Sequence, residues 1–334
     1  MISNCHSEVP AINSSDQKVR TEPTLLEALV VLPASTDIVN PCLKLLDRML
    51  GQGIKVQSLL VDRHYSFKAF DRWAQGLRAR SIDQVSDLRS DEHGFKDWDG
   101  MRVAAGWAHC PQTPDRLAKI AAPGLNATED EMAGFNKLIN ERRQYAAQRN
   151  SLLTVDGKIR YTCPARNGTL GCPLVLGSVA TAMEANLPLI ADPPAEIGRP
   201  SICGQQTVQV QIESREQRIF MKPYQRHYWG SKDWYKSYSR RTYVEGWFGI
   251  FKNDTSTGYD RGSHQFRGLP LVSIVIGIAA ATTNLQLLQS WHRETTLGGD
   301  THPLLKADLE FNGYKQLSAE EAAMIHEENR KYAA

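Results

Sequence analysis

The sequence carries little net charge and lacks a segment that would direct it out of the cytoplasm. Its 39 Lys and Arg residues nearly balance its 37 Asp and Glu residues, for a formal charge of +2. Such a balance neither demands nor excludes a nucleic-acid partner. The first residues, MISNCHSEVPAINSS, have no basic start followed by an apolar core, so they do not read as a signal peptide. We therefore expect a cytoplasmic protein.

The chain has a single long apolar run, at residues 268–288. It contains Thr282, Thr283 and Asn284 and has no basic anchor immediately outside one end. This pattern favours a buried core helix over a membrane span, so we expect no membrane partner. With 41% hydrophobic and 23% charged residues, the rest has the composition of a globular protein of one or two domains.

The tight CxxC pairs of zinc knuckles are also missing, although the chain has six cysteines. Cys110, Cys163 and Cys172 each precede a proline, and Cys203 lies in SICGQ. Four thiols on turns in one region suggest tetrahedral Zn²⁺, whereas the spacing argues against it. The sequence leaves zinc binding by these four residues open, and a reducing compartment disfavours disulfides.

Strand and helix patterns alternate in the first part of the chain. Residues 24–35, 55–62 and 81–89 have the apolar patterns of strands, and residues 40–53 and 67–79 have helical periodicity. Short alternation of this kind predicts a βαβ core with parallel strands. We therefore expect an α/β protein.

The segment 94–215 differs, with many Gly and Pro turns, one clear helix at 129–150 and the four cysteines. We divide the chain into an unpatterned polar stretch, the first part of a core, a cysteine-bearing insertion, the second part of the core and a tail. These are residues 1–22, 23–93, 94–215, 216–295 and 296–334.

Cations and aromatic rings are interleaved in residues 222–252. Cations suit phosphates and flat rings suit bases, so this segment has the composition of a nucleic-acid surface. The alternative is a helix whose rings are buried while its Lys and Arg side chains reach the surface. The residues concerned are Lys222, Tyr224, Arg226, Tyr228, Trp229, Lys232, Trp234, Tyr235, Lys236, Tyr238, Arg240, Arg241 and Lys252.

Within it, YSRRTYVEGWFGIFK predicts a helix with one carboxylate framed by cations. At about 100° per residue, Tyr238, Arg241, Glu245 and Lys252 share an arc of roughly 60°. An i,i+4 pair such as Arg241 and Glu245 is also common on plain solvated helices. The adjoining apolar stripe is formed by Val244, Phe248 and Phe251.

A second carboxylate, Asp62, ends an apolar strand in LLVDRHYSF, where its side chain can reach a cleft. It could instead cap the helix that follows. Asp62, Glu245 and a third carboxylate could hold two hard divalent cations for phosphodiester cleavage. Arg241 and Lys252 would then hold phosphates, and Tyr238 would orient them.

The spacing of Tyr238, Arg241, Glu245 and Lys252 resembles the Y-R-E-K signature of a large group of bacterial insertion-sequence DDE transposases. The segment Asp62–Phe67 loosely resembles the preceding signature of that group, with His64 in place of Gly or Ala. The cysteine-bearing segment and QFRGL…TTNLQLL are similar to actinobacterial transposases. The resemblance covers about residues 24–290.

The resemblance implies a ribonuclease-H-like α/β fold with an insertion before the last catalytic helix. It also implies catalysis by Asp62 and Glu245 with Mg²⁺ or Mn²⁺, DNA contacts by Tyr238, Arg241 and Lys252, and cutting and joining of DNA ends. Members of the group commonly act as dimers, so a homodimer is a further expectation.

The first catalytic Asp of that fold is not recognisable. Asp16 lies in a polar run and Asp37 follows the first strand, so neither resembles a ligand on a hairpin strand. We expect an N-terminally truncated transposase that does not transpose as given. The alternatives are a non-catalytic DNA-binding remnant and a zinc-stabilised nuclease of the same fold.

Overall fold

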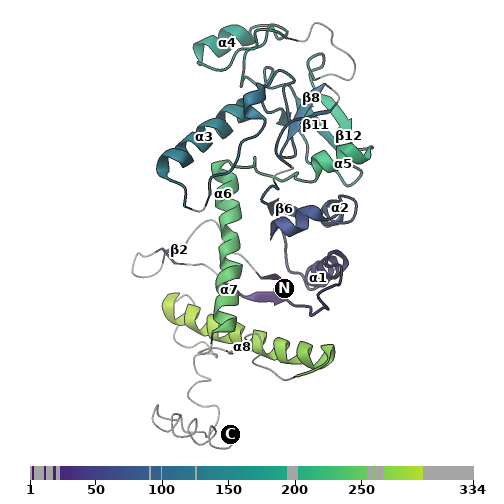
Figure 1. Cartoon of the computed structure of the whole chain (residues 1–334), viewed down its shortest axis with the longest axis vertical. Coiled ribbons are helices and arrows are strands. Elements are labelled where there is room, and N and C mark those ends of the chain that lie inside the picture. Colours follow the sequence, from purple (N-terminus) through teal and green to yellow (C-terminus); the bar gives the residue numbers. More distant parts are fainter. Residues whose placement is uncertain are drawn as a thin grey trace, which may run out of the picture.

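Small sheets and separate helices make up the fold (Figure 1). The computed structural model describes residues 2–3, 11–12, 18–19, 23–89, 92–98, 100–124, 126–193, 202–253, 257, 259 and 266–295. In these residues the sheets have two or three strands. The predicted α/β class is confirmed. The five-stranded mixed sheet of a ribonuclease-H fold is not seen in this part of the chain.

Short antiparallel pairs form the N-terminal part. β1 (Ile2–Ser3) pairs with β4 (Leu26–Ala28), and β2 (Ala11–Ile12) pairs with β3 (Lys18–Val19). The strand expected at 24–35 is therefore only three residues long. The backbone N–H and C=O of Leu26 instead bond the side-chain amide of Asn284, at 2.9 and 2.8 Å.

The predicted parallel βαβ unit is present. It comprises α1 (Val39–Gly51), β5 (Ser58–Val61), the 3₁₀ turn η1 (Arg63–Phe67), α2 (Ala74–Arg78) and β6 (Asp83–Ser86). β5 and β6 are parallel, with Val61 opposite Ser86. Leu46, Trp73 and Leu77 fill the core between the helices and this pair of strands.

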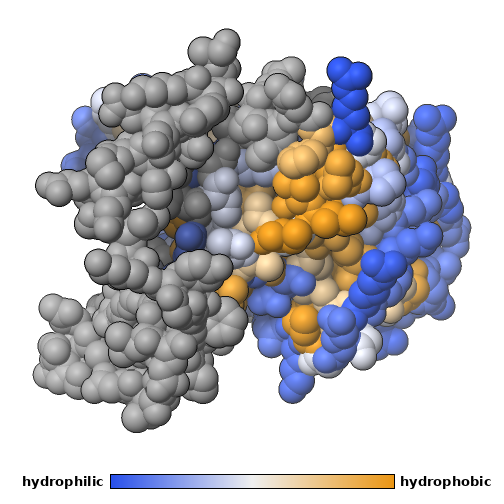
Figure 2. Space-filling view, turned by 90° about the horizontal axis from the view of Figure 1, so that it is seen from below, coloured by the Kyte–Doolittle hydropathy of each residue, from blue (hydrophilic) through white to orange (hydrophobic). Residues whose placement is uncertain are grey.

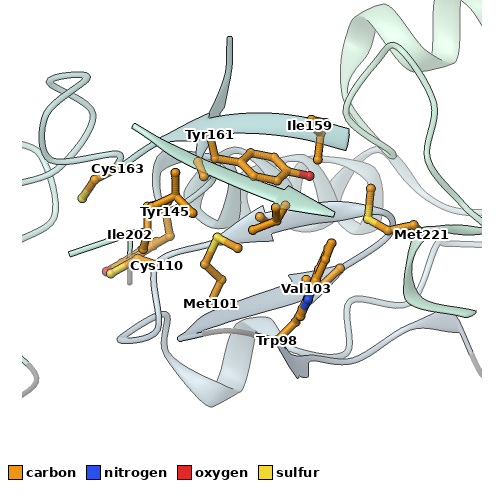
Figure 3. Packing of buried hydrophobic residues seen from close by; sticks show 14 of the residues in the cluster. Trp98, Met101, Val103, Cys110, Tyr145, Ile159, Tyr161, Cys163, Ile202 and Met221 are labelled. Carbon is orange, nitrogen blue, oxygen red and sulfur yellow. The ribbon is translucent and has the colours of Figure 1, made fainter. Parts of the chain in front are cut away.

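Two three-stranded antiparallel sheets form the cysteine-bearing segment. One contains β7 (Lys96–Trp98), β8 (Met101–Ala104) and β9 (Trp107–His109), and the other contains β10 (Gln148–Arg149), β11 (Lys158–Thr162) and β12 (Val208–Gln211). Figure 3 shows their side chains packed against each other between β8 and β11.

Helices and one tight turn complete this segment. They are the 3₁₀ turn η3 (Asp115–Leu117), α3 (Glu129–Gln144) and α4 (Ser178–Glu184). α3 begins with a capping box between Thr128 and Glu131. The turn between β8 and β9 requires Gly106, because its φ is +72° and a Cβ there would lie 2.5 Å from the backbone N of Tyr224.

A nearly continuous helical rod leads down from this segment in Figure 1. After α5 (Arg215–Met221), the rod consists of α6 (Lys232–Tyr238), the 3₁₀ turn η4 (Ser239–Arg241) and α7 (Thr242–Lys252). α8 (Leu269–Thr295) crosses its lower end and packs on it through Trp247, Phe251 and Ala280.

α8 is not the buried core helix that the sequence predicted. It packs against α7 and β4, and its outer face is open in the described structure. Figure 2 shows an apolar patch on this end of the molecule. By length and composition alone Leu269–His292 could cross a membrane, and 11% of its most apolar window is buried. Its exposed large residues are Leu269, Leu271, Ile274, Ile278 and Leu285.

Candidate active site

Three of the four Y-R-E-K residues contact one another along the helical rod. Arg241 Nη1 lies 2.8 Å from Glu245 Oε1, and the Arg241 guanidinium lies 5.6 Å from the centre of the Tyr238 ring. The 3₁₀ turn η4 advances each of its residues by about 20° more than an α-helix does. Over its three residues the turn adds about 60° of rotation, and the positions of Tyr238, Arg241, Glu245 and Lys252 still lie on one side of the rod. Lys252, exposed, is the last residue of α7.

The turn that carries Arg241 packs against the strand that ends at Asp62. η4 contacts β5, and α6 contacts β6. Asp62 is exposed and caps η1, where its Oδ1 accepts a hydrogen bond from the backbone N–H of His64 at 3.3 Å. The capping role that the sequence left open is therefore present. The Asp62 residue as a whole remains exposed.

Asp87 is a second carboxylate at this edge, and the sequence analysis did not single it out. Because Val61 and Ser86 are register partners in parallel strands, Asp62 and Asp87 follow them at the same edge of the sheet. The sequence did contain a signal for Asp87, because it lies near the end of a predicted strand, as Asp62 does. Both carboxylates act on Tyr238: burial raises the pKa of its phenol, the charges of Asp87 and Asp62 add to this, and those of Arg241 and Arg63 oppose it.

Asp87 differs from Asp62 in being almost fully engaged. Its Oδ2 accepts from Arg63, with Nε at 2.8 Å, and its Oδ1 accepts from the Trp229 indole N–H at 3.1 Å and the Leu88 backbone N–H at 2.8 Å. Asp87 in turn raises the pKa of the Arg63 guanidinium. A carboxylate with these partners has little capacity left for a metal ion.

The donor set for a divalent cation is therefore partial in the described structure. Asp62 and Glu245 are exposed carboxylates of the kind that Mg²⁺ and Mn²⁺ accept, so they fit the ion chemically. No three His, Cys, Asp or Glu side chains in the described residues stand ready to hold a metal ion. Asp16, which the sequence did not identify as the missing ligand, lies outside those residues.

Four of the six rings in the predicted nucleic-acid surface are buried, whereas Tyr235 and Tyr238 are half-buried. Tyr224, Tyr228, Trp229 and Trp234 are each less than 5% exposed, so they cannot stack on bases. They serve the core instead, where the Tyr228 hydroxyl bonds His109 Nε2 at 2.7 Å. The alternative interpretation, buried rings with cations at the surface, describes the segment. Its exposed cations are Arg226, Lys232, Lys236 and Lys252.

The four candidate zinc ligands lie together. Cys110, Cys163, Cys172 and Cys203 are each less than 9% exposed and line one cavity. Burial raises the pKa of Cys110 to about 12, and the charges of the other three thiols contribute. Among these four cysteines none is in a disulfide. Figure 3 shows Cys110 and Cys163 at the same end of the core between the sheets.

Comparison with known proteins yields no relative: no family model, no curated protein and no solved structure matches the chain.

Proposed function

We propose that the protein is an insertion-sequence transposase of the DDE type, which cleaves and joins DNA phosphodiester bonds. The observation that carries the proposal is the contact of Tyr238, Arg241 and Glu245 on one side of the helical rod, next to the strand that ends at Asp62. The spacing of these residues with Lys252 is that of the signature described above. The ribonuclease-H-like core, the cytoplasmic location and the homodimer belong to the same proposal.

The cations in this arrangement suit the DNA backbone. Arg241 forms a partly exposed i,i+4 pair with Glu245, which is worth about 0.3–0.5 kcal/mol, and its guanidinium lies over the Tyr238 ring. A phosphate or a metal ion at Glu245 can therefore displace that pair at little cost. Arg241 would bind one phosphate, and the exposed Lys252, three turns further along α7, would bind another.

Asp62 and Glu245 would hold Mg²⁺ or Mn²⁺. When bound, the metal supplies activation of the attacking water or hydroxyl and stabilisation of the leaving oxygen. The side chains around it have separate tasks. Tyr238 is fixed by stacking on Trp234, with ring centres 4.8 Å apart, and its hydroxyl can orient a phosphate next to Arg241.

A second candidate function is DNA binding without cleavage. The hydrogen bonds of Asp87 to Arg63 and Trp229 favour this function, because they occupy the carboxylate. Asp62 and Glu245 are then the two accessible carboxylates, whereas a two-metal site uses three. This function needs the cations and not the carboxylates. A nuclease of the same fold without strand transfer is separated from a transposase by end-joining assays.

Salt-dependent binding tests the DNA contacts that both candidates share. We expect the full chain to bind duplex DNA with an affinity that falls as salt rises. Arg241→Gln and Lys252→Gln should each weaken binding to all sequences and lower the slope of log K against log salt by about 1. Lys44→Gln, at an exposed position on α1, is the matched control. A chain that does not bind DNA would contradict both candidates.

Plasmid nicking then separates the two. With Mg²⁺ or Mn²⁺, nicking that is lost in both Asp62→Asn and Glu245→Gln, while DNA binding persists, assigns catalysis to these carboxylates. Binding without nicking at any metal concentration assigns the non-catalytic function. Nicking that survives both substitutions would overturn the assignment of the site.

A further inference from the structure

Four cysteines that are far apart in the sequence surround one cavity at the end of the core between the two three-stranded sheets. Cys110 directly follows β9, and Cys163 directly follows β11. Cys172 and Cys203 lie in the connection from β11 to β12. The remaining lining residues are Gln112, Leu170, Leu174, Val175 and Ile190.

Hydrogen-bonded turns follow two of the cysteines. The backbone N–H of Thr113 donates to the Cys110 carbonyl at 3.1 Å, and the N–H groups of Arg166 and Asn167 donate to the Cys163 carbonyl at 3.0 and 3.1 Å. These two Cys-Pro turns are therefore closed by their own backbone just after the cysteine.

The other turns are fixed by hydrogen bonds of their own. The Ser178 hydroxyl donates to the Cys172 carbonyl at 2.8 Å and accepts from the Cys172 N–H at 3.0 Å. The Thr113 hydroxyl donates to the Cys110 carbonyl at 2.6 Å. These hydrogen bonds fix the backbone of Cys110 and Cys172 next to the cavity.

Two simpler roles have to be weighed for these residues. A buried cysteine often serves only as a small apolar residue, and two close pairs could form disulfides. Core packing alone does not require all four thiols to line the same cavity. Among these four cysteines no disulfide is formed.

We propose that Cys110, Cys163, Cys172 and Cys203 bind one structural Zn²⁺ ion. Four thiolates are the donor set of tetrahedral zinc sites and of iron–sulfur clusters. The cavity volume of about 10 Å³ is close to that of a single water-sized sphere, which suits one ion and not a four-iron cluster. No three side chains in the described residues stand at metal-binding geometry, so binding would require the thiols to move toward a common point.

The site would close a cross-link over the turns that follow β9 and β11 and the long connection to β12. A structural zinc site supplies folding free energy to a segment of small sheets. This inference does not depend on catalysis, since it concerns the cysteine-bearing segment and none of the residues proposed to contact DNA.

The test is metal analysis of the untagged full-length chain. We expect about one zinc per chain, and after exchange with Co²⁺ the absorption of tetrahedral cobalt with sulfur-to-cobalt charge transfer. Serine at any one of the four cysteines should abolish retention of the metal through a chelating column. Cys42→Ser is the matched control, because Cys42 is a described cysteine that lies in a different core cluster.

A second variant guards against loss of metal through misfolding. Cys203→His keeps a zinc-binding side chain and should retain cobalt with weaker charge transfer, since one sulfur ligand is replaced by nitrogen. A folded chain that holds neither zinc nor cobalt, one that carries an iron–sulfur cluster, or one that loses metal equally in Cys42→Ser would overturn the proposal.

Discussion

At the residue scale, the two carboxylates that end β5 and β6 have opposite surroundings. Asp62 is exposed and caps one turn, whereas Asp87 is 8% exposed and accepts from Arg63, Trp229 and Leu88. Trp229 is 1% exposed, so its indole N–H depends on Asp87 for a partner. The same residue type at the same sheet edge thus serves stability in one case and is accessible to ligands in the other.

Replacing Asp87 should therefore cost more stability than replacing Asp62. Asp87→Ala leaves the buried indole N–H of Trp229 unsatisfied, which should lower the free energy of unfolding by about 1–3 kcal/mol. Asp62→Ala removes an exposed cap and should cost less than about 1 kcal/mol. Urea unfolding followed by tryptophan fluorescence measures both. Equal losses would show that Asp87 does not anchor Trp229.

A buried His109 makes the fold sensitive to acid. Its Nδ1–H donates to the Arg102 carbonyl at 3.3 Å, and its Nε2 accepts from the Tyr228 hydroxyl, which in turn accepts from Arg142 Nε at 2.8 Å. Burial, together with the Arg142 charge, lowers the pKa of His109 from 6.5 to about 3. The ring is therefore neutral in the native state at neutral pH.

We expect stability to fall as the pH is lowered below 6.5. Between pH 6.5 and about 3 the unfolded chain binds a proton at His109 that the native chain does not, so acid favours unfolding. The slope from this residue approaches about 1.4 kcal/mol per pH unit, and above pH 6.5 it vanishes. Urea titrations from pH 7.5 to 4.5 should show a flatter dependence in His109→Gln. His227→Gln, at a partly exposed position, should keep the slope of the unmodified chain.

At the element scale, Asn284 connects α8 to two other elements. Its Oδ1 accepts from the Leu26 N–H and from the Trp247 indole N–H at 3.1 Å, and its Nδ2 donates to the Leu26 carbonyl. The side chain therefore fixes β4 and α7 on the same face of α8. This places the helix that carries Glu245 relative to the N-terminal strands.

Asn284→Leu should destabilise the packing of α8. The change leaves the Leu26 backbone groups and the Trp247 indole without their partner, at a cost of about 1–3 kcal/mol or more for the set. Ile278→Ser is the matched control on the same helix, because Ile278 is 64% exposed and its replacement should be nearly neutral. Thermal unfolding distinguishes them, and an unaffected Asn284 variant would rule out this connecting role.

Local patterns in the sequence predicted elements better than they predicted surroundings. The helices α1, α3 and α8 and the parallel pair β5–β6 follow from periodicity and turn residues, which act over a few positions. The burial of Trp229 does not follow from such patterns, because its partner Asp87 is more than 100 positions away in the sequence. The exposure of Ile278 does not follow either, because it depends on a face of α8 that nothing in the described residues covers. Asp87 lies near the end of a predicted strand just as Asp62 does, but its place beside Asp62 depends on the tertiary pairing of β5 with β6.

At the scale of the whole molecule, the proposed metal site and the proposed DNA contacts lie in two different regions of the described chain. The four cysteines and the two three-stranded sheets lie at one end, and the helical rod carries the candidate DNA-contact residues away from them toward α8 (Figure 1). Tyr224 and Met221 belong to the core of the sheets, while Trp229 and Trp234 pack beside β6.

The bond between Leu26 and Asn284 also has a consequence for synthesis on the ribosome. The two residues are 258 positions apart. At roughly 5–20 residues per second, Leu26 emerges about 13–50 s before its partner has been made. During that interval β4 has neither the amide of Asn284 nor the cover of α8, and its short edge is open to other chains. The nascent protein thus completes β4 long before α8 can cover it, whereas the neighbouring β5–β6 unit can close within the 29 residues from Ser58 to Ser86.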